Sequence, residues 1–202
     1  IIAECKSGMK DTMTSAGHTT AAGRAASYIS RSAMHSDLTD GIAFYEFVCD
    51  LDEHFEERKE ELIDKLQMTI AEILRRGNLA VSYTGDREVR ELLEPCIDRL
   101  SRKLSTRAEI TTRDRVPLVI KNEGFQTASK VQYVALAGNY KEHGFDFTGA
   151  LNVLQVIFSY DYLWINVRVK GGAYGSMCSF GRNGVSYFTS YRDPKLLETY
   201  EI

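Results

Sequence analysis

The 202-residue sequence lacks several features that would each indicate a class of function. Its 25 basic and 28 acidic residues give a formal charge of −3, so no basic surface is predicted for nucleic acid. No apolar run is long enough to cross a bilayer, and no G-x-x-x-x-G-K-[ST] loop is present to hold a nucleotide phosphate. We therefore expect neither a nucleic acid nor a membrane as a partner.

Cysteine pairs at the spacing of metal-binding or redox motifs are also missing. The four cysteines form no C-x-x-C motif and lie far apart, at Cys5, Cys49, Cys96 and Cys178. Such thiols are expected to be reduced and mostly buried, which favours an intracellular or organellar protein, cytoplasmic if bacterial. The sequence starts with Ile1-Ile2 and no methionine, so we expect a fragment of a longer protein.

The composition that is present is that of a folded protein, with 44% apolar residues. Helical periodicity runs from about residue 19 to residue 76 and predicts a long packed helix at its end. The apolar stripe of that helix consists of Leu62, Ile63, Leu66, Ile70, Ile73 and Leu74. Gly77-Asn78 are predicted to end it with a left-handed cap. Alternation over residues 78–84 then predicts a half-buried strand. Asp86 is predicted to cap a further helix, which Pro95 should kink or restart.

The second half of the sequence predicts strands and helices after a charged stretch at residues 101–115. Strands are predicted at 116–120 and 131–137, and a buried helix or helix pair at 145–169. Residues 173–180 and 185–191 are predicted to form a hairpin around Gly181-Arg182-Asn183-Gly184. Asp193 is predicted to cap a last helix, with Pro194 at its first position.

These elements predict an α/β fold of the α+β type, in which mixed sheets pack with helices. We predict two partial domains, residues 1–105 and 116–202, joined by a linker at 106–115. Residues 78–84 and 131–137 are then expected to lie in two different sheets.

The most informative motif is Arg168-Val169-Lys170-Gly171-Gly172-Ala173-Tyr174-Gly175. Arg168 supplies N–H donors that stay charged near neutral pH and Tyr174 supplies an O–H, so the pair could hold a carbonyl whose oxygen gains negative charge. Gly171 and Gly172 allow a sharp backbone turn and the close approach of a substrate strand. The alternative is structural, because Gly-Gly before alternating residues is also a common start of a β-hairpin.

The frame R-x-x-G-G-A-Y-G, followed by Ser190-Tyr191-Arg192-Asp193-Pro194, resembles the C-terminal half of the insulinase/pitrilysin superfamily of zinc peptidases, and within it the presequence-protease branch. The resemblance is specific between roughly Gln132 and Pro194. It implies a clamshell of two homologous halves that encloses a chamber for peptides. Residues 1–105 would end the third peptidase-like domain, and residues 116–202 would start the fourth, both of the insulinase/mitochondrial processing peptidase-like metallohydrolase type. It also implies that Arg168 and Tyr174 reach the substrate.

In that superfamily the zinc is held by H-x-x-E-H and a distant Glu of the N-terminal half. This sequence has no H-x-x-E-H, and its nearest approach, residues 54–58, carries Arg58 where the second His would stand. His18, His35 and His143 are isolated and predicted to be capping or surface residues. We therefore assign no metal and no catalytic residue to this chain, and expect it to be inactive alone. The resemblance implies zinc in the parent enzyme, with the N-terminal half of the same protein as partner.

The function that the resemblance implies is that of the C-terminal substrate-binding part of a zinc-dependent metalloendopeptidase that degrades unstructured peptides. An alternative is a non-catalytic structural or substrate-guiding member of the superfamily. A third possibility, a binding module that uses the hairpin edge for β-augmentation, would need an exposed edge strand. Ser176, Cys178 and Ser179 have no histidine close in sequence, so none is predicted to be a nucleophile.

Overall fold

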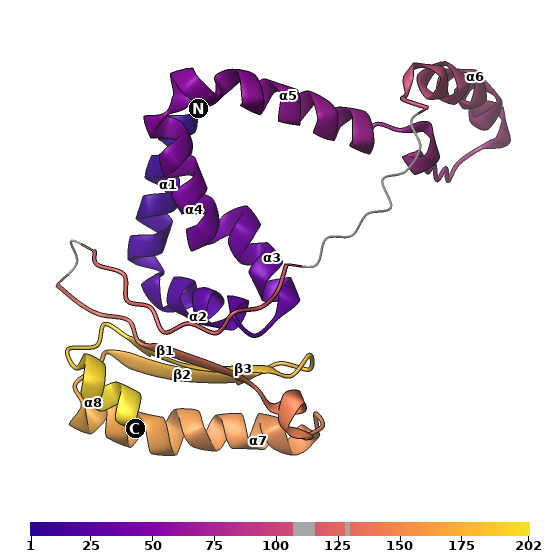
Figure 1. Ribbon diagram of the computed structural model, residues 1–202. Coiled ribbons are helices and arrows are strands. Elements are labelled where there is room, and N and C mark those ends of the chain that lie inside the picture. The colour runs from indigo at the N-terminus through magenta and orange to yellow at the C-terminus, as the bar shows by residue number, and fades with distance from the viewer. Residues whose placement is uncertain (107–115, 128–129) are drawn as a thin grey trace. The chain divides into compact units, whose positions relative to one another are not determined.

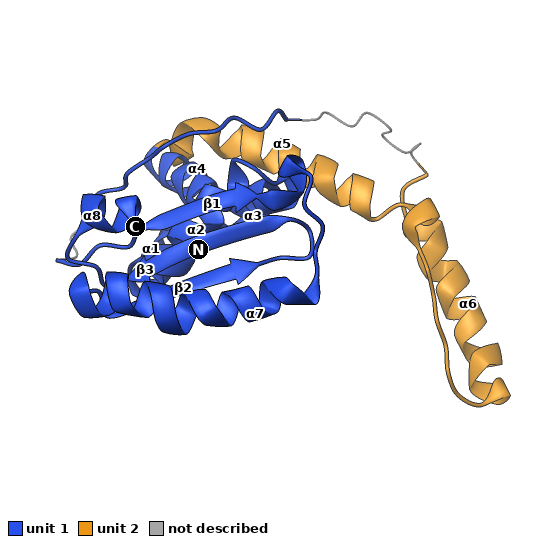
Figure 2. Ribbon diagram, turned by 90° about the horizontal axis from the view of Figure 1, so that it is seen from below, with its two compact units in different colours: residues 1–53, 116–202 blue, residues 54–115 orange. Residues whose placement is uncertain are grey.

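The computed structural model describes residues 1–106, 116–127 and 130–202 (Figure 1). The chain forms two compact units, of which the first combines Ile1–Glu53 with Val116–Ile202 and the second is His54–Arg115 (Figure 2). The predicted division of the parent protein into a third and a fourth peptidase-like domain concerns different residue ranges and stays a prediction.

A small antiparallel sheet is at the centre of the first unit. Its strands are β1 (Ala135–Asn139), β2 (Gly175–Phe180) and β3 (Val185–Tyr191), in the order β1-β3-β2. The sheet pairs Ala135 with Thr189 and Cys178 with Phe188. Helix α2 lies along one face and α7 along the other (Figure 1). Because side chains alternate along a strand, β3 sends one set of residues to each helical layer. The α+β fold class is confirmed.

Four short helices, not one continuous helical region, make up the N-terminal part: α1 (Ile2–Ser15), α2 (Gly17–Ser27), α3 (Arg31–Asp40) and α4 (Ile42–Glu53). The Ser30 hydroxyl accepts a hydrogen bond from Ala33 N at the start of α3, and Asp37 Oδ1 accepts one from Ile42 N at the start of α4. Arg24 donates to both Asp37 and Glu123, which ties the extended segment at residue 123 to α2 and α3.

The layer on the other face of the sheet is helical from residue 149 to residue 170, as the sequence predicts. It consists of α7 (Gly149–Ile157) and the two π-helical segments η3 (Phe158–Tyr162) and η4 (Trp164–Lys170), preceded by the 3₁₀ turn η2 (Tyr140–His143). It is only partly buried, since no residue of α7 is fully buried. The core under the sheet consists of Leu163, Val167, Ala173 and Cys178, with Phe158, Phe180 and Phe188 packed against it.

The predicted hairpin is confirmed, because β2 pairs along its whole length with β3 around the Gly181–Gly184 turn. Gly181 N donates to Val185 O at 2.7 Å, and Gly184 has a φ of +99°. The strand predicted at 131–137 is shifted and begins at Ala135, since Gln132 pairs outside the sheet with Asp193. The strand predicted at 116–120 is wrong, because these residues form no ladder with any described strand.

The start of the last helix, α8 (Leu196–Glu201), also differs from the prediction. Asp193 does not cap it, and Pro194 is not its first residue. Asp193 is completely buried, exchanges backbone hydrogen bonds with Gln132, and accepts a bond from Lys195 N at 2.8 Å through Oδ1. Asp193 is held in the bridge to Gln132, and the helix begins two residues later than predicted.

The second unit contains α5 (Phe55–Ile73), the 3₁₀ turn η1 (Arg76–Asn78) and α6 (Arg87–Lys103). The strand predicted at 78–84 is wrong, and so is the prediction that it belongs to a second sheet, because residues 79–84 carry no strand. The left-handed cap is also wrong. Asn78 instead donates its side-chain amide to the carbonyls of Glu72 and Ile73 in the last turn of α5. Asp86 stands at the start of α6, without a side-chain cap bond, and α6 is continuous through Pro95.

The apolar stripe of α5 is largely exposed in the part of the chain that the structure describes. No residue of α5 is buried, and Leu66, Ile70 and Ile73 are each more than half exposed. None of the described helices is long and apolar enough to cross a membrane.

Candidate functional site

The Gly171-Gly172 turn connects η4 to β2 and places Arg168 and Tyr174 close together. Gly172 N donates to Arg168 O at 2.9 Å, and Ala173 N donates to Val167 O at 3.2 Å. A Cβ on Gly171 would overlap the Val167 carbonyl oxygen, and Gly172 has a φ of +88°. Both positions thus require glycine, one for space and the other for its backbone conformation.

Arg168 is half-buried and its guanidinium lies against aromatic rings. The Cζ atom is 3.9 Å from the centre of the Trp164 ring and 5.8 Å from the centre of the Tyr174 ring. Within the described part of the chain, its side chain has no hydrogen bond or ion pair. The N–H donors of Arg168 are therefore not used by a neighbouring protein group.

Tyr174 is held through its backbone and its ring, while its hydroxyl is left to solvent. Its N–H donates to Tyr191 O at 3.0 Å, and its ring makes an edge contact with the Tyr191 ring at 5.8 Å. The side chain is exposed, at 66% for the residue, and no described residue hydrogen-bonds to its hydroxyl. The structure thus brings Arg168 and Tyr174 side by side with their donors available, and their role in holding a substrate stays a prediction.

An aromatic cluster that the sequence did not indicate continues from Tyr174 towards α2. Tyr191 contacts His18 at 4.9 Å and Tyr133 at 5.6 Å between ring centres. Gly17, the first residue of α2, packs on the Tyr133 ring so closely that a Cβ would overlap it. His18, predicted as an isolated residue, is therefore part of the packing behind Tyr174. No local sequence signal could have shown this, because His18 lies more than 100 positions from both tyrosines.

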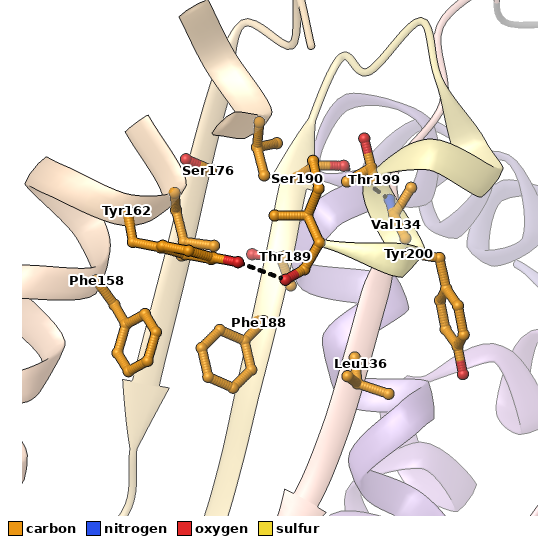
Figure 3. Close-up of a pocket in the computed structure, with 13 residues that line it drawn as sticks. Val134, Leu136, Phe158, Tyr162, Ser176, Phe188, Thr189, Ser190, Thr199 and Tyr200 are labelled. Carbon is orange, nitrogen blue, oxygen red and sulfur yellow. Dashed lines mark hydrogen bonds between the residues drawn. The ribbon is translucent and has the colours of Figure 1, made fainter. Parts of the chain in front are cut away.

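A cavity of about 200 Å³ lies between the sheet and the helical layer (Figure 3). The Phe158 and Phe188 rings meet there edge to face at 5.6 Å, and α8 contributes Thr199 and Tyr200. No charged side chain lines it, and neither Arg168 nor Tyr174 reaches it. The cavity is thus an apolar space in the packing, separate from the Arg168–Tyr174 pair.

The hydroxyl and thiol groups near the motif are not arranged for nucleophilic chemistry. Ser176 Oγ is buried, lines the cavity and has no hydrogen-bond partner among the described residues. Burial raises the pKa of the Cys178 thiol, whose sulfur is 3.5 Å from Ser159 Oγ. A raised pKa leaves less thiolate near neutral pH, and the thiolate is the reactive form.

Among the described residues, no group of three or more His, Cys, Asp or Glu side chains lies close enough together to hold a metal ion. Structural and catalytic zinc sites need at least three such protein ligands. The described side chains therefore do not fit a zinc ion.

Family models match both ends of the chain. Residues 122–202 match the PreP C-terminal domain, and residues 1–51 match the model described as peptidase M16-C associated. The whole chain also aligns with presequence protease 1, chloroplastic/mitochondrial, of Arabidopsis thaliana, at 29% identity over 205 residues. The chain belongs to the presequence-protease family.

Relatives of this chain include Protein HypA of Clostridium perfringens, with 35% identity over 201 residues, and the mitochondrial presequence protease of Saccharomyces cerevisiae, with 26% over 197 residues. The alignments cover 100% and 92% of the chain, and 20% of each relative. The Arabidopsis alignment covers all of the chain and 19% of that protein. The chain thus spans about a fifth of the length of the curated relatives it matches.

Proposed function

We propose that this chain is the C-terminal substrate-binding part of a zinc-dependent metalloendopeptidase that degrades unstructured peptides in an enclosed chamber. The observation that carries the proposal is the Arg168–Tyr174 pair, in which a guanidinium and a phenol ring lie 5.8 Å apart with no described group bonded to either head. Membership of a peptidase family supplies the reaction class, and the pair supplies a place for the peptide.

The pair can act on a peptide through hydrogen bonds alone. Arg168 would donate N–H bonds to a substrate carbonyl, and Tyr174 would donate its O–H to an oxygen that becomes negative as the peptide bond is attacked. Such donors accelerate a reaction when they bind the developing charge more strongly than the ground state. The glycine turn between them sets the distance between the donors, which reduces the cost of orienting them.

Zinc would be bound by other parts of the parent enzyme, because the described residues offer no set of metal ligands. We propose that the ligands and the general base belong to the N-terminal half of the same protein, which would face the Arg168–Tyr174 pair across the chamber. When bound, zinc would activate a water molecule for attack on the peptide bond. Elemental analysis of the dialysed chain should then find no stoichiometric zinc, and one zinc per chain would contradict this assignment.

A non-catalytic relative is the alternative from the same superfamily. The presence of both Arg168 and Tyr174 argues against it, because a structural subunit needs neither donor. The two functions are separated by the sequence of the full-length protein, where the peptidase requires H-x-x-E-H and a distant glutamate. A full-length sequence without that motif would favour the structural or substrate-guiding role.

The direct test is Arg168→Ala in the full-length protein, with cleavage of an unstructured peptide as the readout. We expect kcat/KM to fall by about a hundredfold or more, since both positioning and charge stabilisation are lost. Arg182→Ala is the matched control, because Arg182 also lies over an aromatic ring, that of Phe147 at 5.2 Å, but stands in the hairpin turn. Equal losses in both variants, or full activity in Arg168→Ala, would contradict the proposal.

A further inference from the structure

We infer that Trp164 is a positioning residue that holds the Arg168 guanidinium ready for a peptide carbonyl. This inference rests on the proposed function and adds a residue that no motif singles out. Trp164 is the only tryptophan of the chain and starts the η4 segment, four positions before Arg168. Residues four apart lie on the same side of a helical segment, so the two side chains meet.

The guanidinium lies over the face of the Trp164 ring, and its N–H donors have no partner among the described residues. With Cζ 3.9 Å from the ring centre, the separation is that of two stacked planar groups. The N–H bonds of a guanidinium lie in its plane, so stacking does not consume them. Trp164 therefore restricts the side chain without satisfying it, which a carboxylate partner could not do.

Arg24 shows the contrasting arrangement within the same unit. Its guanidinium donates to Asp37 Oδ2 at 2.6 Å and to Glu123 Oε2 at 3.0 Å, so its donors are occupied by carboxylates. Such an arginine joins parts of the fold. Arg168 has the same chemistry but only ring contacts among the described residues, with Trp164 on one side and Tyr174 near it.

Lys170, the cation two residues after Arg168, has a side-chain partner of its own. Lys170 Nζ donates to Asn166 Oδ1 at 3.1 Å, and Asn166 in turn donates to Tyr162 O at 2.9 Å. Lys170 is thus bonded along η4. Arg192 lies over the Tyr191 ring at 5.5 Å, and Arg168 is the cation over the Tyr174 ring.

A double-mutant cycle in the full-length protein tests the inference. We expect Trp164→Leu to lower kcat/KM by about three- to thirtyfold, the range that a lost cation–π contact predicts. Trp164→Phe, which keeps a ring face, should recover most of the loss. In an Arg168→Ala background, Trp164→Leu should change kcat/KM by less than about twofold, because a residue that acts through Arg168 has nothing left to position. Phe147→Leu, under Arg182, is the matched control and should leave kcat/KM unchanged.

Peptide affinity, measured by fluorescence anisotropy of a labelled unstructured peptide with chelator present, separates this inference from the proposed function. Coupling between Trp164 and Arg168 in Kd, together with no peptide cleavage by the zinc-loaded wild type in the separate activity assay, would overturn the peptidase function and retain the positioning role. Cleavage by the wild type with equal Trp164→Leu losses in both Arg168 backgrounds would overturn the positioning role. That role is also overturned if Trp164→Phe fails to rescue, or if the loss only tracks a lower melting temperature.

Discussion

The helical layer around Leu163 and the helix α5 carry similar apolar patterns, yet only the first contributes buried residues. Leu163 and Val167 are 7% and 3% exposed and pack under the β2–β3 hairpin, whereas Leu66 and Ile70 of α5 are 52% and 54% exposed. All buried residues among those described belong to the first unit. Helical periodicity thus shows which face of a helix is apolar, but burial requires a partner surface that the pattern does not contain.

The largest expected difference between the two units is in the free energy of unfolding lost when one leucine in each is truncated to alanine. Leu163→Ala should lower the free energy of unfolding by about 2–5 kcal/mol, because it leaves a cavity in a packed core. Leu66→Ala should change it by no more than about 0.5 kcal/mol. Urea denaturation followed by circular dichroism measures both, and equal losses would mean that α5 is packed in solution.

Two glycines, one in each unit, differ in backbone conformation. Gly172→Ala should cost about 1–2 kcal/mol, since its φ of +88° is unfavourable for a residue with a Cβ. Gly77 of the second unit has no positive φ and open space where a Cβ would stand, so Gly77→Ala should be neutral or stabilise by about 0.5 kcal/mol. The melting temperatures of the two variants give the answer. A harmless Gly172→Ala would show that the turn relaxes, and that it does not fix the distance from Arg168 to Tyr174.

The smallest expected difference in stability is between two ion-paired glutamates, one in each unit, and it depends on pH. Arg24 donates to Glu123 and lowers its pKa, with a further bond from the Tyr28 hydroxyl, and Lys65 lowers the pKa of Glu61 on the exposed face of α5. A lowered pKa in the folded state gives stability that is present above about pH 4.3, the ordinary value, and is lost as the pH falls through the folded pKa.

Glu123→Gln should therefore destabilise the protein by about 1 kcal/mol at neutral pH and remove part of the acid dependence. Glu61→Gln should have no measurable effect, because an exposed pair is screened by solvent and salt. Urea midpoints measured from neutral pH down to about pH 3 test this. A wild type and a Glu123→Gln variant with the same pH profile would contradict it.

The sequence predicted the elements whose signals are local. The hairpin followed from the turn residues at 181–184, and the closeness of Arg168 and Tyr174 followed from the two glycines between them. The spacing of Trp164 and Arg168 was also readable, but an aromatic residue four positions before an arginine is too common to mark a site. The strands predicted at 78–84 and 116–120 failed because alternation does not supply a neighbouring strand, and Asn78 uses its side chain to complete α5.

Contacts between distant segments were beyond what the sequence could predict. The packing of His18, Tyr133 and Tyr191 behind Tyr174 depends on α2 crossing the sheet, and the Arg24–Glu123 pair joins residues 99 positions apart. No period or turn signal encodes such contacts. They determine which donors are occupied, and so they separate the structural Arg24 from the available Arg168.

The proposed function requires that Tyr174 offers its hydroxyl to a peptide, and one substitution removes only that group. In the full-length protein, Tyr174→Phe should lower kcat by roughly ten- to a thousandfold with an unchanged melting temperature, since the hydroxyl bonds to no described residue. Tyr160→Phe is the matched control, because Tyr160 is 75% exposed on the helical layer. Full peptidase activity of Tyr174→Phe, or a loss equal to that of Tyr160→Phe, would contradict the proposed role of the hydroxyl.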